Sequence, residues 1–415
     1  MTAAPLPPSH SPRTAGAHRA GFWVVAVSFL LMMAFATVPT PLYALYQRAD
    51  HFPTFTLTLI FGAYAVGVGV ALMLVGHLSD AHGRKRLVLL AIVLALVSAV
   101  IFILRSDVGW LLVARFISGL AIGTLTSAAT AYLTELEIGA ERVGLGKGRA
   151  NVIAGVVNLG GLGTGALISG AMADFVRTPL VFPYVVFAIL FVLAVIAVLL
   201  VPETVDLSRP APRYRPQAVR APHGRVADFR VAATANFAVF AVLGLFTSVA
   251  PTFLAVEFHL TDRLLAGAGT FVVFGGAVVA QIAFGRRSLR THARWGALLI
   301  GAGLVLLAVA ALLVAAWLFV TASAVTGAGI GLLFRAAIGT ASALAPADQR
   351  SSVLATTFLI GYIGMVVPVL TTGALLLFVP PTTVLIGFVV VVVVLASWAG
   401  RRLVLSLGRA STSAV

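Results

Sequence analysis

Long runs of residues without a charge limit what this chain can fold into. A helix that crosses the hydrocarbon core of a bilayer needs about 20 mostly apolar residues. Two runs, 295–334 and 351–400, are long enough for two helices each. We expect breaks near Ala315 and at Pro380-Pro381, because proline stops a helix. Eight further runs fit one helix each: 20–47, 51–79, 87–104, 108–134 (with Arg115 inside it), 150–173, 178–202, 231–256 and 264–285. The sequence therefore predicts an all-α membrane protein with twelve transmembrane helices.

The charged residues are few and unevenly placed. They make up 10% of the chain, against about a quarter in a soluble domain. The 28 Lys and Arg outnumber the 13 Asp and Glu, but they gather in the tails and in short loops on one side of the predicted spans. This pattern marks the cytoplasmic side and argues against a nucleic-acid partner. We expect a multi-pass protein of the plasma (inner) membrane with both termini in the cytoplasm. The absence of cysteine excludes disulfides and thiolate metal sites.

One segment divides the chain into two parts. Residues 203–230 are rich in Pro and Arg and poor in apolar residues, so we expect a flexible cytoplasmic linker. Six predicted spans precede it in residues 20–202, and six follow it in residues 231–402. The Pro- and Ser-rich residues 1–19 are predicted to be disordered in the cytoplasm, and residues 403–415 to form a cytoplasmic tail.

The two parts resemble each other internally. Three short patterns recur in the same order at nearly constant separation: Phe35-Ala36-Thr37-Val38 with Phe246-Thr247-Ser248-Val249, Gly119-Leu120-Ala121-Ile122-Gly123 with Gly327-Ala328-Gly329-Ile330-Gly331, and Gly161, Gly165 and Gly170 with Gly364, Pro368 and Gly373. Small residues are common in membrane helices, so each pattern alone is weak. Together they favour a duplication. Parallel repeats of this kind predict two pseudo-symmetric six-helix bundles with a substrate site between them near the midplane.

A short polar stretch separates the second and third predicted spans. It reads Gly76-His77-Leu78-Ser79-Asp80-Ala81-His82-Gly83-Arg84-Lys85-Arg86. Three consecutive cations place it on the cytoplasmic side, and two glycines indicate a tight turn. The stretch resembles the signature loop between helices 2 and 3 of the major facilitator superfamily. The resemblance extends over about residues 20–402, and it implies the family's twelve-helix transporter fold.

The resemblance also implies a conformational latch, whose residues in this chain are Gly76, Asp80, Gly83, Arg84, Lys85 and Arg86. In the family, the aspartate approaches the start of helix 11 in the other half while the cytoplasmic side is closed. A carboxylate at a helix N-terminus gains roughly 0.3–1 kcal/mol, and span 11 is expected to begin near Ser351-Ser352. The alternative is an ordinary basic loop with a helix-capping aspartate.

Two further stretches are similar to weaker family motifs. Arg115-x-x-x-Gly119 in span 4 is similar to the family's helix 4 motif, and Gly123 follows one turn later. Pro202-Glu203-Thr204 after span 6 is similar to the Pro-Glu-Thr that closes the first half in many members. Both fall where the resemblance requires them.

Span 5 carries a face of small residues. Gly161-x-x-x-Gly165-Ala166-x-x-Ser169-Gly170 is similar to the antiporter motif of drug exporters, although Ala166 stands in place of proline and Ser169 in place of glycine. We expect Gly161, Gly165 and Gly170, together with the span 4 glycines, to let helices pack closely. The packing is either against the opposite half or within one half.

The residues that would couple transport to protons are not obvious. No Asp or Glu lies in the middle of a predicted span, although proton-coupled carriers usually need a titratable group there. Glu135 at the inner end of span 4 and Glu257 at the outer end of span 7 are candidates, with ordinary interfacial acids as the alternative. Arg115 lies inside span 4, where a charge is costly and indicates function, unless its side chain snorkels to the outer interface. Arg335, near the inner end of span 10, is expected to snorkel.

If the resemblance holds, spans 1, 4, 7 and 10 line the substrate cavity. The polar or aromatic candidates on these spans are Thr40, Tyr43, Tyr46, Thr126, Ser127, Ser248 and Thr252. For each of them the alternative is a hydrogen bond between helices. A lining with so few charges suits a hydrophobic or amphipathic solute better than a polyanion or a free sugar.

Together these features predict a secondary active transporter that moves a small solute by alternating access. Proton-coupled efflux is the first hypothesis. Uptake of a small metabolite by symport or facilitated diffusion is the alternative, and a membrane receptor or enzyme a remote one. No phosphate-binding glycine loop or metal-ligand spacing is present in the sequence, so we expect no ATP, cofactor or metal and no enzymatic activity. The expected partners are the solute, the lipid bilayer and protons, and the expected state is a monomer.

Overall fold

The computed structural model describes residues 12–75, 82–140, 149–205, 220–222, 224–250, 263–346 and 349–412. Within them the protein is helical, and twelve helical segments are long and apolar enough to cross a membrane. The first half contains α1 (Pro12–Thr37), η1 (Thr40–Leu42), α2 (Tyr43–Asp50), α3 (Thr54–Leu74), α5 (Arg84–Leu104), α6 (Val108–Ala140), α7 (Arg149–Phe175) and α8 (Phe182–Leu199). The second half contains α9 (Val226–Gly244), the π-helical η3 (Leu245–Val249), α11 (Arg263–Ala283), α12 (Leu289–Leu313), α13 (Ala316–Leu344), α14 (Arg350–Leu375) and α15 (Pro381–Thr412).

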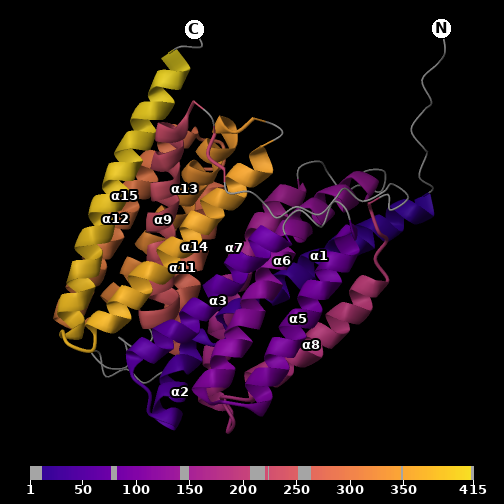
Figure 1. Cartoon of the computed structure of the whole chain (residues 1–415), viewed down its shortest axis with the longest axis horizontal. Helices are drawn as coiled ribbons and strands as arrows, with labels where there is room; N and C mark the ends of the chain where they lie inside the picture. Colours follow the sequence, from indigo (N-terminus) through magenta and orange to yellow (C-terminus); the bar gives the residue numbers. More distant parts are fainter. Residues whose placement is uncertain are drawn as a thin grey trace.

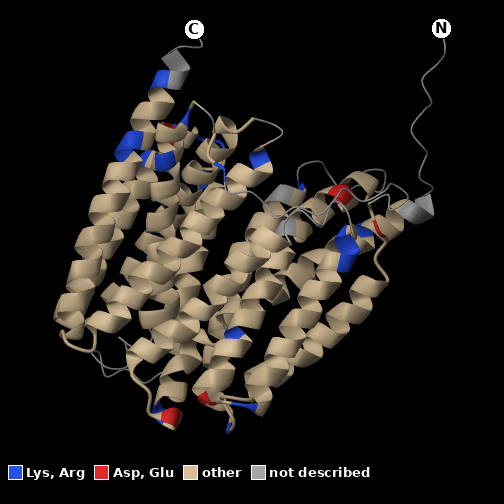
Figure 2. Cartoon of the chain, in the orientation of Figure 1, with Lys and Arg blue, Asp and Glu red and all other residues tan. Residues whose placement is uncertain are grey.

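The start of α1 and the end of α15 lie at the same end of the molecule (Figure 1), which we call the terminal end; the opposite one is the distal end. Charged residues gather at both ends and leave the middle of the helices almost uncharged (Figure 2). A multi-pass membrane protein accounts for this distribution, since a charge at the centre of a bilayer costs roughly 3 kcal/mol or more.

The helix boundaries follow the predicted breaks, with one correction at the N-terminus. The run 295–334 breaks between Leu313 and Ala316, and the run 351–400 breaks before Pro381, where proline is tolerated as a first helical residue. The N-terminal expectation is wrong in part: α1 already begins at Pro12, inside the segment predicted to be disordered, and Ala15 is fully buried against its surroundings. At the other end of the chain, α15 continues as helix through most of the predicted tail.

The predicted repeat has a structural counterpart in the packing of span 2 on span 4. A Cβ added at Gly119 of α6 would overlap the carbonyl oxygen of Tyr64 on α3. In the second half, a Cβ at Gly327 of α13 would overlap the carbonyl oxygen of Val273 on α11. The glycines four residues later, Gly123 and Gly331, repeat this close approach to the same partner helices. Equivalent glycines therefore bring equivalent helices together in both halves.

Spans 1 and 7 are both irregular at equivalent positions. In span 1, α1 ends at Thr37, and η1 follows around Pro39 and Pro41. In span 7, the π-helix η3 comes directly before Ala250 and Pro251 in the sequence. The carbonyl oxygen of Thr247 in η3 accepts a hydrogen bond of 3.0 Å from Thr40 Oγ1 in the other half.

The two halves meet along α7 with α11 and along α3 with α14 (Figure 1). Near the distal end the first pair is in tight contact, because Gly170 faces the backbone of Arg263 and Gly267 faces the backbone of Ala166. Glycines nearer the terminal end are less closely packed. Among the described residues, no atom outside their own helix lies within 4 Å of a Cβ placed at Gly155, Gly160 or Gly275. The α7–α11 contact is thus tight at the distal end, and these three glycines nearer the terminal end have open space beside them.

Candidate functional site

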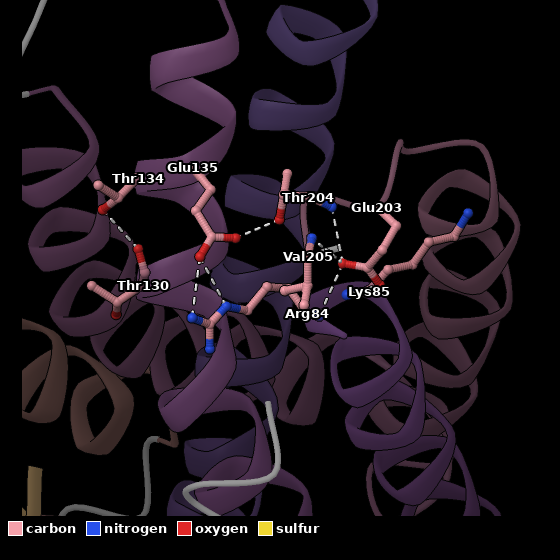
Figure 3. A network of polar contacts seen from close by, with 8 residues as sticks. All are labelled: Arg84, Lys85, Thr130, Thr134, Glu135, Glu203, Thr204 and Val205. Atoms are coloured by element: carbon pink, nitrogen blue, oxygen red, sulfur yellow. Dashed lines mark hydrogen bonds and ion pairs between the residues drawn. The ribbon is translucent and has the colours of Figure 1, made fainter. Parts of the chain in front are cut away.

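A polar network joins the start of α5 to the segment that follows α8 at the terminal end (Figure 3). Glu203 is its centre. One carboxylate oxygen accepts hydrogen bonds from the backbone N–H groups of Arg84 at 3.0 Å and Thr204 at 2.9 Å. The other accepts from the backbone N–H of Lys85 at 3.2 Å. Glu203 therefore caps the N-terminus of α5, where unsatisfied donors and the helix dipole favour a negative charge.

Gly83 is the residue that lets this cap form. Its φ of 96° lies in the left-handed region that disfavours side chains. A Cβ at this position would also overlap the Glu203 carboxylate. Both the turn and the approach of the carboxylate therefore require glycine here.

A second carboxylate extends the network to α6. Glu135 Oε1 lies 3.1 Å from both Nε and Nη2 of Arg84. Its other oxygen accepts a short hydrogen bond from Thr204 Oγ1 (Figure 3). The Lys85 ammonium donates to the carbonyl oxygen of Leu199 at 2.6 Å, at the C-terminal end of α8, where a cation is favoured. The basic stretch thus binds α5, α6 and α8 of the first half to one another.

The predicted latch residues divide between described and undescribed parts of the chain. Gly83, Arg84 and Lys85 lie in this network, and Arg86 is exposed beside it. Gly76 and Asp80 lie outside the described residues. Glu203 was known only as part of a Pro-Glu-Thr motif, and its capping of α5 was missed. The available signal was an isolated acid placed on the same side as a glycine turn and three cations.

Arg115 is buried in the first half and does not reach the interface. Only 2% of it is exposed, which overturns the snorkelling alternative. Its Nη1 donates to the carbonyl oxygen of Ala36 at 3.0 Å, one residue before α1 ends. Its guanidinium carbon lies 4.4 Å from the centre of the Tyr64 ring on α3. Among the described residues no carboxylate pairs with it, and its Nε has no hydrogen-bond partner. A buried charge balanced only by a carbonyl and a ring is costly to keep.

The predicted cavity residues have different surroundings. Thr40 is buried and bonds to Thr247, and the Tyr46 hydroxyl bonds to the Tyr184 hydroxyl at 3.2 Å. Thr126 Oγ1 donates to the carbonyl of Ile122 in its own helix. The contacts of Thr40 and Tyr46 are the interhelical hydrogen bonds named as the alternative to substrate contact, whereas that of Thr126 is local to α6.

Two other candidates keep an unused polar atom. Tyr43 Oη and Ser248 Oγ are buried and have no hydrogen-bond partner among the described residues. Tyr43 also interacts electrostatically with Arg115. Thr252 and Glu257 lie outside the described residues, and so does the side chain of Ser127. Tyr43 and Arg115 are therefore the buried polar groups that the structure leaves least satisfied near span 1.

An ion pair closes the distal end between the two halves. Asp174 on α7 lies 3.1 Å from Nη1 of Arg263, the first residue of α11. Its other carboxylate oxygen accepts from the backbone N–H of Leu264 at 2.7 Å. Sequence reasoning missed this pair, because the residues lie in different halves and only the docking of α7 on α11 brings them together.

The span 5 glycines divide between the two expected kinds of packing. A Cβ at Gly161 or Gly165 would overlap α1 of the same half, whereas a Cβ at Gly170 would approach the start of α11 in the other half to 2.5 Å. Gly163 also faces α11. One helix therefore uses one face within its bundle and another between the bundles.

Arg335 lies at the terminal end of α13 with an exposed side chain, as expected for a snorkelling residue. It donates to the carbonyl oxygens of Gln281 at 3.3 Å and Gly285 at 3.0 Å, at the end of α11. This contact satisfies carbonyls that a helix terminus leaves without donors.

A small apolar pocket lies inside the second half, between η3 and α12–α15. Its lining includes Leu245, Val249, Leu307 and Phe319, and none of the predicted cavity residues. Within the described part of the chain, no three His, Cys, Asp or Glu side chains gather as a metal site requires.

Comparison with known sequences identifies one family. The sequence model of the Major Facilitator Superfamily matches residues 22–368. The chain is 35% identical over 91 residues to an arabinose-proton symporter of Bacillus subtilis, a match that covers 22% of this chain and 19% of that protein. It is 27% identical over 152 residues to an uncharacterized MFS-type transporter of Mycobacterium tuberculosis, covering 37% of this chain and 25% of that protein. The chain thus spans a quarter or less of the length of these two relatives.

Solved structures share the fold over nearly the whole chain. A peptide transporter in complex with sulfate has a TM-score of 0.73 at 13% identity and covers 94% of both chains. A nucleoside transporter has a TM-score of 0.70 at 13% identity, covering 92% of this chain and 99% of that one. A human organic anion transporter has a TM-score of 0.64 at 16% identity, covering 93% of this chain and 100% of that one. At such low identity these likenesses show the fold alone.

Proposed function

This chain belongs to the major facilitator superfamily, and we propose that it exports a small amphipathic or hydrophobic solute by proton-coupled alternating access. Membership makes it a secondary transporter of the membrane and not an enzyme. The direction of transport, the class of solute and the coupling ion are what we propose beyond family membership. It places the protein in the plasma (inner) membrane as a monomer, with the terminal end in the cytoplasm, because the terminal end carries most of the cations.

The observation that carries the alternating-access proposal is the unequal contact between α7 and α11. Asp174, Gly170 and Gly267 hold these helices together at the distal end, while Gly160 and Gly275 have no close neighbour from another helix among the described residues nearer the terminal end. Such a structure is expected of a carrier whose distal gate is closed and whose cytoplasmic side is open. Rocking one half against the other would open the distal gate and close the cytoplasmic one.

We assign the coupling of transport to protons to the buried cation Arg115 and to the carboxylates Glu135 and Glu257. Arg115 holds the carbonyl of Ala36 where span 1 breaks, so a change in its charge balance acts directly on a helix that contacts the other half. Glu135 and Glu257 remain the candidate proton carriers. Glu135 is held by Arg84 and Thr204, so its release would accompany any rearrangement of the cytoplasmic network.

Uptake is the second candidate. A curated relative is named as a proton symporter for arabinose, although the match covers only 22% of this chain. The near-match of span 5 to the antiporter motif favours export, and the uncharged lining favours an amphipathic solute over a sugar.

The test is a solute screen in inverted membrane vesicles with an imposed pH gradient. We expect amphipathic compounds to accumulate inside inverted vesicles only when the lumen is acidic, with saturable rates that collapse when a protonophore is added. Vesicles from cells without the protein are the control. Accumulation that does not depend on the pH gradient would rule out proton coupling. Saturable flux of a sugar into right-side-out vesicles would establish the uptake alternative.

A further inference from the structure

The terminal end of the second half carries an unusual excess of cations. Residues 264–415 contain nine arginines and a single acid, Asp348, which lies outside the described residues. In the first half, by contrast, Arg84 and Lys85 are held by a carboxylate and a helix terminus. Loop cations that only orient a membrane protein need no particular arrangement. The arrangement on α12 and α15 is therefore informative.

The two helices pack antiparallel, and two contacts fix their register. A Cβ at Gly400 of α15 would overlap Ala297 of α12. Toward the terminal end, a Cβ at Gly408 of α15 would lie 3.5 Å from the guanidinium carbon of Arg290 on α12. With a rise of about 1.5 Å per residue in both helices, Arg294 and Arg402 then lie at nearly the same depth.

Exposed side chains from both helices lie within about one helical turn of this depth. We call them the basic-aromatic face: Arg290, Arg294 and Trp295 on α12, and Trp398, Arg401 and Arg402 on α15. The four arginines are exposed, as are Trp295 at 45% and Trp398 at 46%. Trp398 precedes Arg401 and Arg402 by about one helical turn, and Trp295 follows Arg294 directly.

This combination is the one expected at the headgroup level of a bilayer. Indole rings favour the boundary between headgroups and acyl chains, and guanidinium groups one turn beyond it reach the phosphate level, where their planar donors can bind a phosphate with two hydrogen bonds. Toward the membrane middle, both helices expose apolar side chains, among them Leu298 at 54% and Val394 at 62%. An acyl chain would lie along these residues.

We propose that the basic-aromatic face binds an anionic phospholipid of the leaflet at the terminal end, with its phosphate between the arginines of α12 and α15. Charge complementarity selects the headgroup, since among the described residues of these helices no acidic side chain offsets the arginines. The paired tryptophans and the apolar strip select a lipid over a soluble anion. The site is independent of the solute that the carrier moves.

The test uses the full chain purified in a neutral detergent and titrated with phosphatidylglycerol or phosphatidylcholine. Bound lipid is counted by native mass spectrometry, and the thermal midpoint is followed in parallel, because a ligand that binds the folded state raises it. We expect phosphatidylglycerol to bind and to raise the midpoint while phosphatidylcholine does neither. The double variant Arg294→Gln with Arg402→Gln should bind phosphatidylglycerol about thirtyfold more weakly, since each of the two cations near a charged surface contributes roughly 1 kcal/mol.

The matched control is Arg149→Gln with Arg350→Gln, which removes two exposed cations of the terminal end from α7 and α14 and should bind like the unmodified chain. Should the glutamine variant fail to fold, Arg294→Lys with Arg402→Lys keeps the charge and should lose only part of the affinity. Phosphatidylglycerol with brominated chains should quench tryptophan fluorescence less in Trp295→Phe with Trp398→Phe. Equal loss in both glutamine pairs, or an equal midpoint rise from inorganic phosphate, would overturn the lipid site.

Discussion

Asp174 and Arg263 form an ion pair of 3.1 Å across the boundary between the two halves. The carboxylate of Asp174 also accepts a hydrogen bond of 2.7 Å from the backbone N–H of Leu264, so it caps the N-terminus of α11. The pair is only 20% and 29% exposed, which limits screening by water. It joins α7 to α11 where their glycines are in closest contact, so under the proposed alternating access it would hold the distal gate closed.

Asp174→Asn should weaken this gate. The loss of a partly shielded ion pair and of a charge at a helix N-terminus amounts to about 1 kcal/mol, or about a fivefold shift toward the distally open state. The chain has no cysteine, so spin labels can be placed through Leu104→Cys and Trp317→Cys, exposed at the distal end of each half. Electron–electron distances should lengthen in Asp174→Asn but not in Asp50→Asn, an exposed acid of the same end. Unchanged distances would show that the pair does not hold the gate.

Gly83→Ala should destabilise the fold more than an ordinary substitution in a turn. A side chain at its φ of 96° is strained, by roughly 1–2 kcal/mol. The Cβ would also displace Glu203 from the start of α5, at a cost of about 1–3 kcal/mol for the donors left unpaired. The matched control is Gly224→Ala, because Gly224 has a φ of 73° but nothing within 4 Å of its Cβ position.

The two substitutions separate strain from the loss of the cap. Thermal unfolding in detergent should show a clearly lower midpoint for Gly83→Ala and a small decrease for Gly224→Ala. Similar decreases would mean that Glu203 contributes nothing beyond the shape of the turn.

The features that follow from length and composition could be predicted from the sequence. The local hydrophobic pattern is enough to predict the twelve spans and the break before Pro381. The internal repeat is enough to predict that Gly119 and Gly327 make equivalent close contacts. The burial of Arg115 could not be predicted, because it depends on which face α6 turns toward α1 and α3. The partners of Glu203 and Asp174 could not be predicted either, since each lies in a segment brought near only by the packing of distant helices.

Arg115→Lys should impair transport while leaving the protein folded. Lysine keeps the charge, but its shorter, non-planar group cannot both donate to the Ala36 carbonyl and lie over the Tyr64 ring. The loss of one charge-assisted hydrogen bond, roughly 1.5–3 kcal/mol, should lower the rate about tenfold or more. Arg335→Lys is the control, because that side chain is exposed and bonds carbonyls at a helix end. Vesicle flux, normalised to the amount of protein in the membrane, measures both. Equal rates for the two variants would remove Arg115 from the coupling assignment.

Thr40→Val tests the contact between the irregular segments of spans 1 and 7. Valine has nearly the shape of threonine but has no hydroxyl to donate. The hydrogen bond of 3.0 Å from Thr40 Oγ1 to the Thr247 carbonyl oxygen would therefore be lost. Because the Thr40 hydroxyl donates to this carbonyl from the other half, the variant removes that hydrogen bond from the distally closed state. The closed state should lose about 0.5–1.5 kcal/mol, a two- to tenfold shift measurable with the same spin-label pair. Thr126→Val removes a hydroxyl that bonds only within α6, so it should leave the distances unchanged. If both variants shift them alike, the effect belongs to hydroxyl loss in general, and the halves are not held together at Thr40.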